Sequence, residues 1–317
     1  MGSKGLAAGS RSGFAGSLAA LFTIVIWGTT FISTKVLLLD FRPVEILFYR
    51  FVMGFLALYL VCPRRLKGVS RRQEVTFALA GLCGICLYYL LENIALTLTM
   101  ASNVGVIISV APFFTAILPY ALRPGADQGF REKLGAGFFA GFIVAMAGIA
   151  MISFNGARLS LNLAGDMLAV LAALVWACYS LLTRKISSFG YPVILTTRRT
   201  FFYGILFMVP ALYFFGFEPG IARFADRTAL FNILYLGLGA SALCFVTWNV
   251  AVKELGAVKT SIYIYMVPVI TVVTSAAVLH ERVTPASAAG TVLTVAGLFI
   301  SAYDKKSKEE VESGCTE

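Results

Sequence analysis

Residues 27–50 read WGTTFISTKVLLLDFRPVEILFYR, and residues 176–199 read WACYSLLTRKISSFGYPVILTTRR. The two stretches have the same length and align without a gap, and the second begins 149 residues after the first. The positions that match or exchange one cation for another include Trp27 and Trp176, Thr34 and Thr183, Lys35 and Arg184, Pro43 and Pro192, and Arg50 and Arg199. So many ordered matches predict that the chain contains two copies of one unit.

The repetition continues beyond these stretches. Further matches, 156 residues apart, are Asn93 and Asn249, Ala95 and Ala251, Ala101 and Ala257, Pro112 and Pro268, and Thr115 and Thr271. The spacing then returns to 149 residues, which pairs Gly141 with Gly290 and Gly148 with Gly297. We therefore expect a first repeat over residues 15–153 and a second over residues 165–303. Residues 1–14 and 304–317 are expected to be a cytoplasmic segment and a cytoplasmic tail.

The composition indicates a membrane protein. Hydrophobic residues make up 59% of the 317-residue chain, charged residues only 13%, and the mean hydropathy is +0.84. A soluble domain carries about a quarter charged residues, so the excess apolar surface must contact lipid. The apolar runs do not alternate with polar residues, which favours helices over strands. Ten runs are expected to cross the bilayer: residues 15–39, 44–62, 74–97, 102–121, 134–153, 165–186, 192–216, 228–251, 257–279 and 285–303. The expected fold is an all-α polytopic membrane protein with ten transmembrane helices.

The positive charge is distributed as in membrane proteins. The net charge of +10 arises from Lys and Arg residues in short clusters between the apolar runs, as in residues 64–72. This pattern is typical of cytoplasmic loops rather than of a nucleic-acid-binding face, and it places both termini in the cytoplasm. Because five is an odd number, the second five-helix copy starts on the opposite side of the membrane and is inverted. Inverted repeats are an architecture of secondary transporters, with the site between the halves.

The repeated motif also carries a family resemblance. Both copies contain Trp-x15-Pro-x6-Arg, and the closing part has the acidic Glu281 followed by the glycine-rich stretch of Gly290 and Gly297. This arrangement resembles the EamA domain of the drug/metabolite transporter superfamily, and within it the bacterial YddG-type (aromatic) amino-acid exporters. The resemblance implies two inverted five-helix repeats around a central cavity in the bacterial inner membrane. It also implies transport of small metabolites without a cofactor or a bound metal.

Two prolines and one cluster of polar residues are the first candidates for the transport site. Pro112 and Pro268 fall near the middle of their helices, where each frees the carbonyl four residues earlier. A kink with free carbonyls at the midplane suits a substrate site, although packing alone can absorb a kink. Tyr88, Tyr89 and Glu92 share a helix face, and Asn93 follows them. A carboxylate is costly in lipid, so we expect Glu92 to line a cavity and bind an amino group or carry a proton. An ion pair near the outer surface is the alternative.

Aromatic and basic residues inside the helices form the second group of candidates. Aromatic rings offer apolar walls with a polar edge, which suits amphiphilic solutes. The candidates of this kind, with one neighbouring amide, are Trp27, Trp176, Tyr179, Trp248, Asn249, Tyr263 and Tyr265. Core packing is the alternative for the first two, and a place in the interfacial belt is the alternative for Trp248. For Arg50 and Arg199 we expect a structural bond to a neighbouring helix, with a substrate carboxylate as the alternative.

These features favour export of small metabolites, amino acids above all, by alternating access. Export of drugs or other organic solutes is the alternative within the same class. A membrane enzyme or a channel is disfavoured, because the lone His280 falls in a loop and no paired carboxylates or metal-ligand spacing occur at membrane depth. A proton-coupled carrier and a facilitator fit equally. The expected partners are a small-molecule substrate and the lipid bilayer, without nucleic acid, in a monomer or a homodimer formed through small-residue helix faces.

Overall fold

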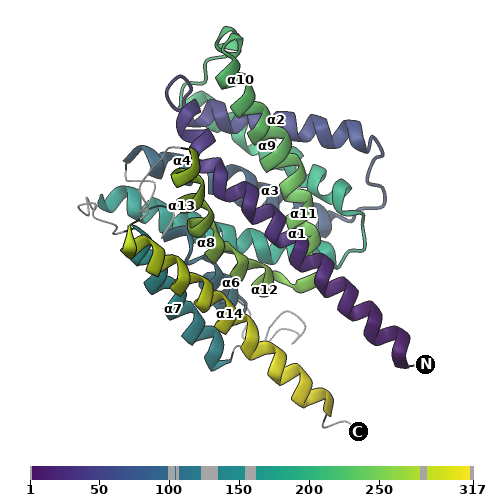
Figure 1. Cartoon of the computed structure of the whole chain (residues 1–317). Coiled ribbons are helices and arrows are strands. Elements are labelled where there is room, and N and C mark those ends of the chain that lie inside the picture. Colours follow the sequence, from purple (N-terminus) through teal and green to yellow (C-terminus); the bar gives the residue numbers. More distant parts are fainter. Residues whose placement is uncertain are drawn as a thin grey trace.

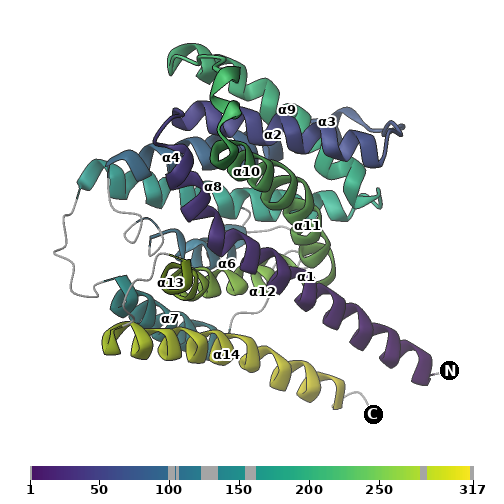
Figure 2. The same cartoon turned by 45° about the horizontal axis from the view of Figure 1, so that its top comes forward.

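The computed structural model describes residues 2–98, 104, 107–122, 135–153, 162–278 and 284–314, and within these ranges the chain is helical without strands. The helices form one bundle, and both ends of the chain project from the same end of it (Figures 1 and 2). The expected all-α fold is therefore confirmed for the described residues. Glu281 and His280, which the sequence analysis considered, lie outside them.

The first repeat contributes the purple to teal part of Figure 1. Its elements are α1 (Gly2–Leu37), α2 (Pro43–Val61), α3 (Arg71–Gly81), the π-helix η1 (Leu82–Leu87), α4 (Tyr88–Leu98), α6 (Ala111–Leu122) and α7 (Ala136–Ser153). α3, η1 and α4 follow one another without a break and make one long helix. Ser70 and Gln73 begin this helix with reciprocal side-chain caps on backbone N–H groups, which satisfy donors that the helix itself leaves free.

The second repeat runs from teal through green to yellow. Its elements are α8 (Leu163–Ser187), α9 (Val193–Phe214), the 3-10 helix η3 (Ile221–Ala225), α10 (Arg227–Leu234), the π-helix η4 (Tyr235–Leu243), α11 (Cys244–Leu255), α12 (Ala257–Ile262), the 3-10 helix η5 (Tyr263–Tyr265), α13 (Met266–Val278) and α14 (Pro285–Gly314). α10, η4 and α11 are continuous, as α3, η1 and α4 are in the first repeat.

The described residues contain five helices that are long and apolar enough to cross a membrane. They are Gly13–Thr34, Pro43–Val61, Arg71–Leu98, Leu163–Ser187 and Arg227–Leu255. Shorter apolar helices occupy Ala111–Ala121, Ala136–Met151, Ala257–Ile270 and Ala288–Ser301. α9 covers the remaining expected stretch and carries Arg198 and Arg199 near its start. Each expected apolar stretch thus contains a helix, and the five long ones make this a multi-pass membrane protein.

The packing of the helices is duplicated along with the sequence. α1 packs against α11 and α13, while its counterpart α8 packs against α4 and α6. α2 packs against η4, and its counterpart α9 packs against α3 and η1. α2 also meets α9, and α7 meets α14, so counterparts contact each other. Each of these helix contacts in one repeat therefore has an equivalent contact in the other repeat, as a twofold relation between the repeats requires.

The two π-helices occupy equivalent places in the two halves. A π-helical turn adds a residue to the helix and shifts the faces on either side of it, and such turns are common at functional sites. Close packing accompanies both: a Cβ at Gly81 would lie 2.5 Å from the carbonyl oxygen of Thr200. Gly237 is the counterpart of Gly81 in the second repeat. A Cβ added to Gly237 would lie 3.0 Å from the Cβ of Met53. The periodicity of the sequence does not distinguish these turns from α-helix.

The small-residue faces of α7 and α14 pack on each other. A Cβ on Gly141 would lie 2.5 Å from the backbone nitrogen of Ser301, and one on Gly297 would lie 2.4 Å from that of Ala145. The two backbones are in direct contact, which only residues without a bulky side chain permit. The expected close approach is therefore found, and the glycines of this face make it within one chain.

Replacing Gly141 by Val should destabilise the protein. The new side chain overlaps the backbone of α14, and overpacking of this kind costs about 1–3 kcal/mol. We expect a lower melting temperature in detergent than for the unmodified protein. The matched control is Gly13→Ala, because a Cβ at Gly13 meets nothing within 4 Å. Equal melting temperatures for Gly141→Val and the unmodified protein would contradict this packing of α7 and α14.

Candidate functional site

All three tryptophans of the chain meet at the centre of the bundle. Trp27 of α1 and Trp176 of α8, which are counterparts in the repeat, lie edge to face with ring centroids 5.3 Å apart. Trp248 of α11 lies 5.1 Å from Trp27 and 5.9 Å from Trp176. Trp248 is fully buried, which places it in the core rather than in an interfacial belt. The indole N–H of Trp27 donates to the carbonyl of Ala240 in η4 at 2.9 Å and fixes its ring.

A small cavity of about 50 Å³ lies beside these rings. Both halves contribute to its wall: Trp27 and Trp176 are counterparts, and so are Ile108 and Ile264. The lining residues are Trp27, Thr30, Phe31, Tyr88, Tyr89, Glu92, Ile108, Ser109, Trp176, Ile264 and Val267. The space is therefore enclosed at the junction of the two repeats.

Glu92 supplies the carboxylate in this wall. It lies on α4, is only 7% exposed, and its Oε2 has no hydrogen-bond partner in the described part of the chain. Tyr88 precedes it by one turn, and the Tyr88 ring lies 4.7 Å from the ring of Trp176. Burial of an ionised carboxylate is costly unless another group satisfies it. The cavity thus presents an acceptor that is open to a ligand, water or a proton.

Arg50 lies next to the cavity but does not line it. It is buried on α2, and its Nε donates to Ser241 Oγ of η4 at 3.0 Å. The guanidinium carbon lies 4.4 Å from the ring centroid of Tyr89, a cation–π arrangement. Arg199, the counterpart of Arg50, forms an ion pair with Glu74 at 2.6 Å. Both arginines therefore make the expected bonds to neighbouring helices.

The two repeated prolines lie behind the cavity wall, and each stands near the start of a helix rather than in its middle, where the sequence predicts it. Turn residues 109–110 precede α6, in which Pro112 is the second residue, and the 3-10 helix η5 precedes α13, in which Pro268 is the third. Both prolines are buried and do not line the cavity. The residues four positions earlier, Ile108 and Ile264, do line it. The break that each proline causes thus brings irregular backbone to the cavity wall from both halves.

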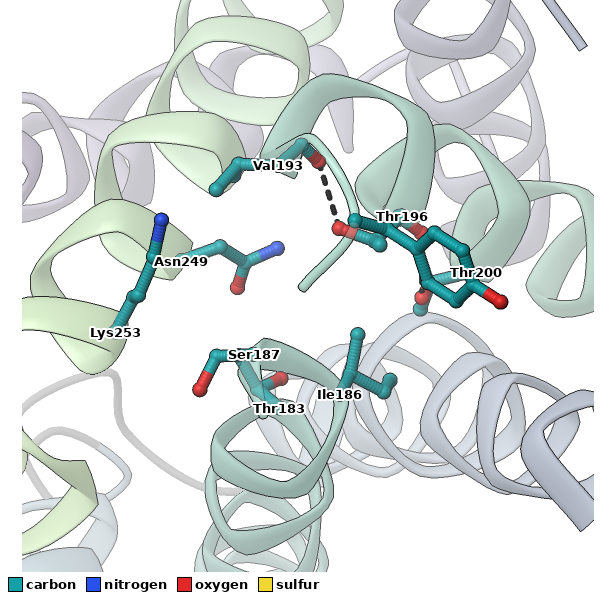
Figure 3. A pocket seen from close by; sticks show the side chains of 9 residues that line it. Thr183, Ile186, Ser187, Val193, Thr196, Thr200, Asn249 and Lys253 are labelled. Atoms are coloured by element: carbon teal, nitrogen blue, oxygen red, sulfur yellow. Dashed lines mark hydrogen bonds between the residues drawn. The ribbon is translucent and has the colours of Figure 1, made fainter. Parts of the chain in front are cut away.

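A second pocket lies at the turn between α8 and α9 (Figure 3). It is lined by Thr183, Ile186, Ser187, Tyr191, Val193, Thr196, Thr200, Asn249 and Lys253. Tyr179 separates it from the cavity: its ring lies 5.1 Å from that of Trp176, and its hydroxyl donates to Asn249 Oδ1 at 3.0 Å. Asn249 Nδ2 in turn donates to Thr197 Oγ1 at 2.8 Å.

Tyr179 rests on a glycine of η1. A Cβ at Gly84 would lie 2.2 Å from Cδ2 of the Tyr179 ring, so the ring lies directly on the helix backbone. This contact and the hydrogen bond to Asn249 hold the Tyr179 side chain of α8 between η1 and α11. Tyr179, Asn249 and Thr197 form a continuous polar chain across α8, α11 and α9, which we call the hydroxyl–amide chain.

The residues singled out in the sequence fall into three groups. Those in the cavity wall are Trp27, Tyr88, Tyr89, Glu92 and Trp176. Those in the layer between the two pockets are Tyr179, Trp248 and Asn249. Those elsewhere are Pro112, Pro268, Asn93, which donates to the Pro43 carbonyl at 3.3 Å, and Tyr263, which lines an apolar groove between α1, α12 and α14.

Sequence reasoning missed several wall residues. Thr30 is the repeat counterpart of Tyr179, so the alignment of the copies carried a signal for it. Phe31 and Val267 are apolar residues in apolar helices, and nothing in the sequence distinguishes them from lipid-facing positions. Gly84 supports Tyr179 through its missing side chain, a role that composition does not reveal.

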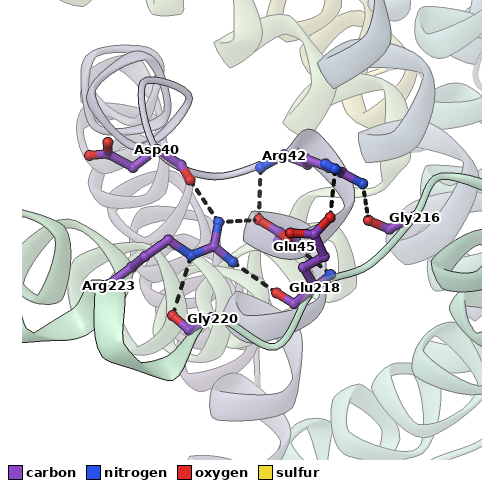
Figure 4. A network of polar contacts seen from close by, with 7 residues as sticks. All are labelled: Asp40, Arg42, Glu45, Gly216, Glu218, Gly220 and Arg223. Atoms are coloured by element: carbon purple, nitrogen blue, oxygen red, sulfur yellow. Dashed lines mark hydrogen bonds and ion pairs between the residues drawn. The ribbon is translucent and has the colours of Figure 1, made fainter.

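A buried carboxylate also joins two connections at one end of the bundle (Figure 4). Glu45, at the start of α2, accepts from the backbone N–H groups of Arg42 at 2.8 Å and Glu218 at 3.1 Å, and from Arg223 Nη1 at 2.8 Å. Arg42 donates to the carbonyl of Gly216 and pairs with Glu218. The bond to Glu45 raises the pKa of the Arg223 guanidinium above its ordinary value. This network ties the α1–α2 turn to the segment between α9 and α10.

Replacing Arg223 by Ala should lower the stability of this end of the bundle. Glu45 would keep its backbone donors but lose its charged partner, and loss of a hydrogen bond to a charged group costs about 1.5–3 kcal/mol. We expect a lower melting temperature in detergent. The control is Arg227→Ala, an exposed arginine four residues along the chain. If Arg223→Ala and Arg227→Ala both melted at the temperature of the unmodified protein, the network around Glu45 would not stabilise the fold.

Duplicated helices, apolar spans and a cavity shared by two halves define a multi-pass membrane transporter. The sequence pattern of the EamA-like transporter family matches residues 14–154 and again residues 163–303. The chain belongs to this family.

Several named proteins resemble the chain over most of its length. An "Uncharacterized transporter" of Archaeoglobus fulgidus is 26% identical over 90% of this chain and 96% of its own. A "Probable terminal-alkyne amino-acid exporter" of Streptantibioticus cattleyicolor is 25% identical over 89% and 91%. A "Probable amino-acid metabolite efflux pump" of Escherichia coli is 26% identical over 93% and 97%. One solved crystal structure covers 90% of this chain and 97% of its own with a TM-score of 0.71 at 19% identity, which establishes the fold alone.

Proposed function

We propose that this protein is a carrier of the bacterial inner membrane that exports small metabolites, amino acids above all, by alternating access. The observation that supports it most is the cavity between the repeats, whose wall contains the counterparts Trp27 and Trp176, and Ile108 and Ile264. A site shared by two related halves can open to either side when the halves exchange conformations. The names of two relatives support amino acids as the cargo.

The proposed topology has ten spans, two inverted five-helix repeats and cytoplasmic termini. Lys and Arg residues gather at the ends where α2 meets α3, where α8 meets α9 and where α11 meets α12, and such residues favour the cytoplasm. The Glu45 network then lies on the periplasmic side. A monomer is sufficient in this proposal, because one chain supplies both sides of the cavity.

The proposed facing state is outward. Thr30 and Phe31 extend the cavity along α1 towards the periplasmic end, and Glu92 does so along α4. On the cytoplasmic side, Trp176 and the hydroxyl–amide chain separate the cavity from the pocket of Figure 3. Opening to the cytoplasm requires that α8, α9 and α11 move apart there, which breaks this chain. The hydroxyl–amide chain is therefore the proposed inner gate.

Removing the gate amide should open the cavity to the cytoplasm more often. The reporter is Thr30→Cys with the native cysteines replaced, labelled by a membrane-impermeant thiol reagent in vesicles of either orientation. We expect Asn249→Ala to speed labelling from the cytoplasmic side, because Tyr179 and Thr197 lose their shared partner. The control is the repeat counterpart Asn93→Ala, whose amide bonds the Pro43 carbonyl instead. Unchanged cytoplasmic labelling in Asn249→Ala would rule out this gate.

Export of drugs or other organic solutes is the second candidate function. The observation that favours it is the ring-rich wall, in which Trp27, Tyr88, Tyr89 and Trp176 offer broad apolar faces to amphiphilic compounds. Competition decides between the two functions. Inhibition of amino-acid flux only by amino acids and their amines favours the first, whereas inhibition by many unrelated amphiphiles favours the second.

Transport of radiolabelled amino acids by purified protein in liposomes tests the proposal. We expect saturable flux in the unmodified protein and strongly reduced flux in Glu92→Gln, since the neutral amide neither attracts a cation nor carries a proton. A pH gradient that accelerates wild-type but not Glu92→Gln flux would assign proton coupling to Glu92, and insensitivity to the gradient would identify a facilitator. Absence of flux for every amino acid in the unmodified protein would reject amino-acid transport.

A further inference from the structure

The buried carboxylate of Glu92, whose Oε2 has no hydrogen-bond partner among the described residues, and the rings around it define the chemistry of the ligand. We propose that the cavity binds a protonated amino group, with the ammonium ion on Glu92 and the aromatic faces of the wall around it. This inference rests on the proposed function and names its substrate class: organic ammonium compounds, including zwitterionic amino acids, rather than neutral or purely anionic metabolites.

The first support is the state of the carboxylate. Glu92 is more than nine-tenths buried, lines the cavity, and has an Oε2 with no hydrogen-bond partner among the described residues. Arg50, the buried cation nearby, is held by Ser241 Oγ and lies over the Tyr89 ring, and it is not part of the cavity wall. Its charge lessens the cost of a buried carboxylate while leaving Oε2 open. A ligand that carries its own cation completes this site.

The second support is the aromatic wall. Tyr88 and Trp176 lie 4.7 Å apart, Tyr88 and Tyr89 lie 4.8 Å apart, and Trp27 meets Trp176 at 5.3 Å, all measured between ring centroids. Clustered rings around an anion attract an ammonium ion through their electron-rich faces and exclude water from it. The same rings offer apolar contact to the rest of an amphiphilic molecule, so an aromatic amine matches both features.

The third support is an asymmetry between the halves. The repeat counterpart of Glu92 is Trp248, so only the first half supplies a charge at this level. The opposite wall consists of Ile264 and Val267 of the second half. A bound molecule is therefore oriented, with its ammonium group towards α4 and its apolar part towards η5 and α13. A neutral hydroxyl group can donate a hydrogen bond to Glu92 but cannot form an ion pair with it.

Tryptophan fluorescence can report binding, because the three tryptophans of the chain pack together beside this cavity. Titrations of the purified protein followed by tryptophan emission compare phenethylamine, 2-phenylethanol and phenylalanine. The first two share a skeleton and differ in charge at one end. We expect phenethylamine and phenylalanine to bind at least about tenfold more tightly than 2-phenylethanol, the factor that one charge-assisted contact supplies.

Variants locate the effect at the carboxylate. Glu92→Gln should remove the preference for phenethylamine over 2-phenylethanol, while Glu92→Asp, which keeps the charge, should retain part of it. Glu218→Gln is the control, since that carboxylate is exposed and pairs with Arg42 far along the chain from α4. The comparison of ligands on the unmodified protein stands even where a variant fails to fold.

The outcomes separate this inference from the proposed function. Equal binding of phenethylamine and 2-phenylethanol, together with amino-acid flux in liposomes, would overturn the ammonium site and leave the carrier function intact. Selective binding of phenethylamine without flux of any amino acid would support the site and reject amino-acid export. Retention of the full preference in Glu92→Gln would also overturn the proposal, because the selectivity would then come from another group.

Discussion

The contact between Trp27 and Trp176 holds the centre of this molecule together. The two rings come from the first helix of each repeat and meet edge to face, and Trp248 closes the group from α11. Around this group, the packing of α1 against α11 and α13 has its counterpart in the packing of α8 against α4 and α6, and the cavity lies where both halves present matching residues. A large substitution or a gap at this point would separate the halves that form the wall.

Sequence duplication made much of this predictable. The positions shared by residues 27–50 and 176–199 located the central tryptophans, and the repeated prolines located the helix breaks next to the lining residues Ile108 and Ile264. The cost of a carboxylate in lipid directed attention to Glu92. Other features depend on three-dimensional fit and were beyond reach. The π-helical turns have ordinary apolar sequences, Gly84 acts through an absent side chain, and Glu45 found its partner Arg223 far along the chain.

The differences between the halves carry as much meaning as the similarities. Tyr179 has Thr30 as its counterpart, Glu92 has Trp248, and Glu45 has Ile194. Because Thr30 replaces Tyr179 in the first repeat, the hydroxyl–amide chain forms at one end of the bundle only. Because Trp248 replaces Glu92 in the second repeat, only the first repeat places a carboxylate in the cavity wall. A symmetric scaffold provides two equivalent ways to open, and these substitutions make the two ends of the pathway chemically distinct. In the proposed cycle, that distinction fixes both the closed side and the orientation of the bound molecule.

The position of a bound amino acid in an experimentally determined complex tests the central claim most directly. The account predicts that phenylalanine lies in the central cavity against Trp27 and Trp176, with its ammonium nitrogen within hydrogen-bonding distance of Glu92 and its ring towards Ile264. A molecule bound only in the pocket of Figure 3 or in the groove beside Tyr263, with the central cavity left unchanged, would contradict it.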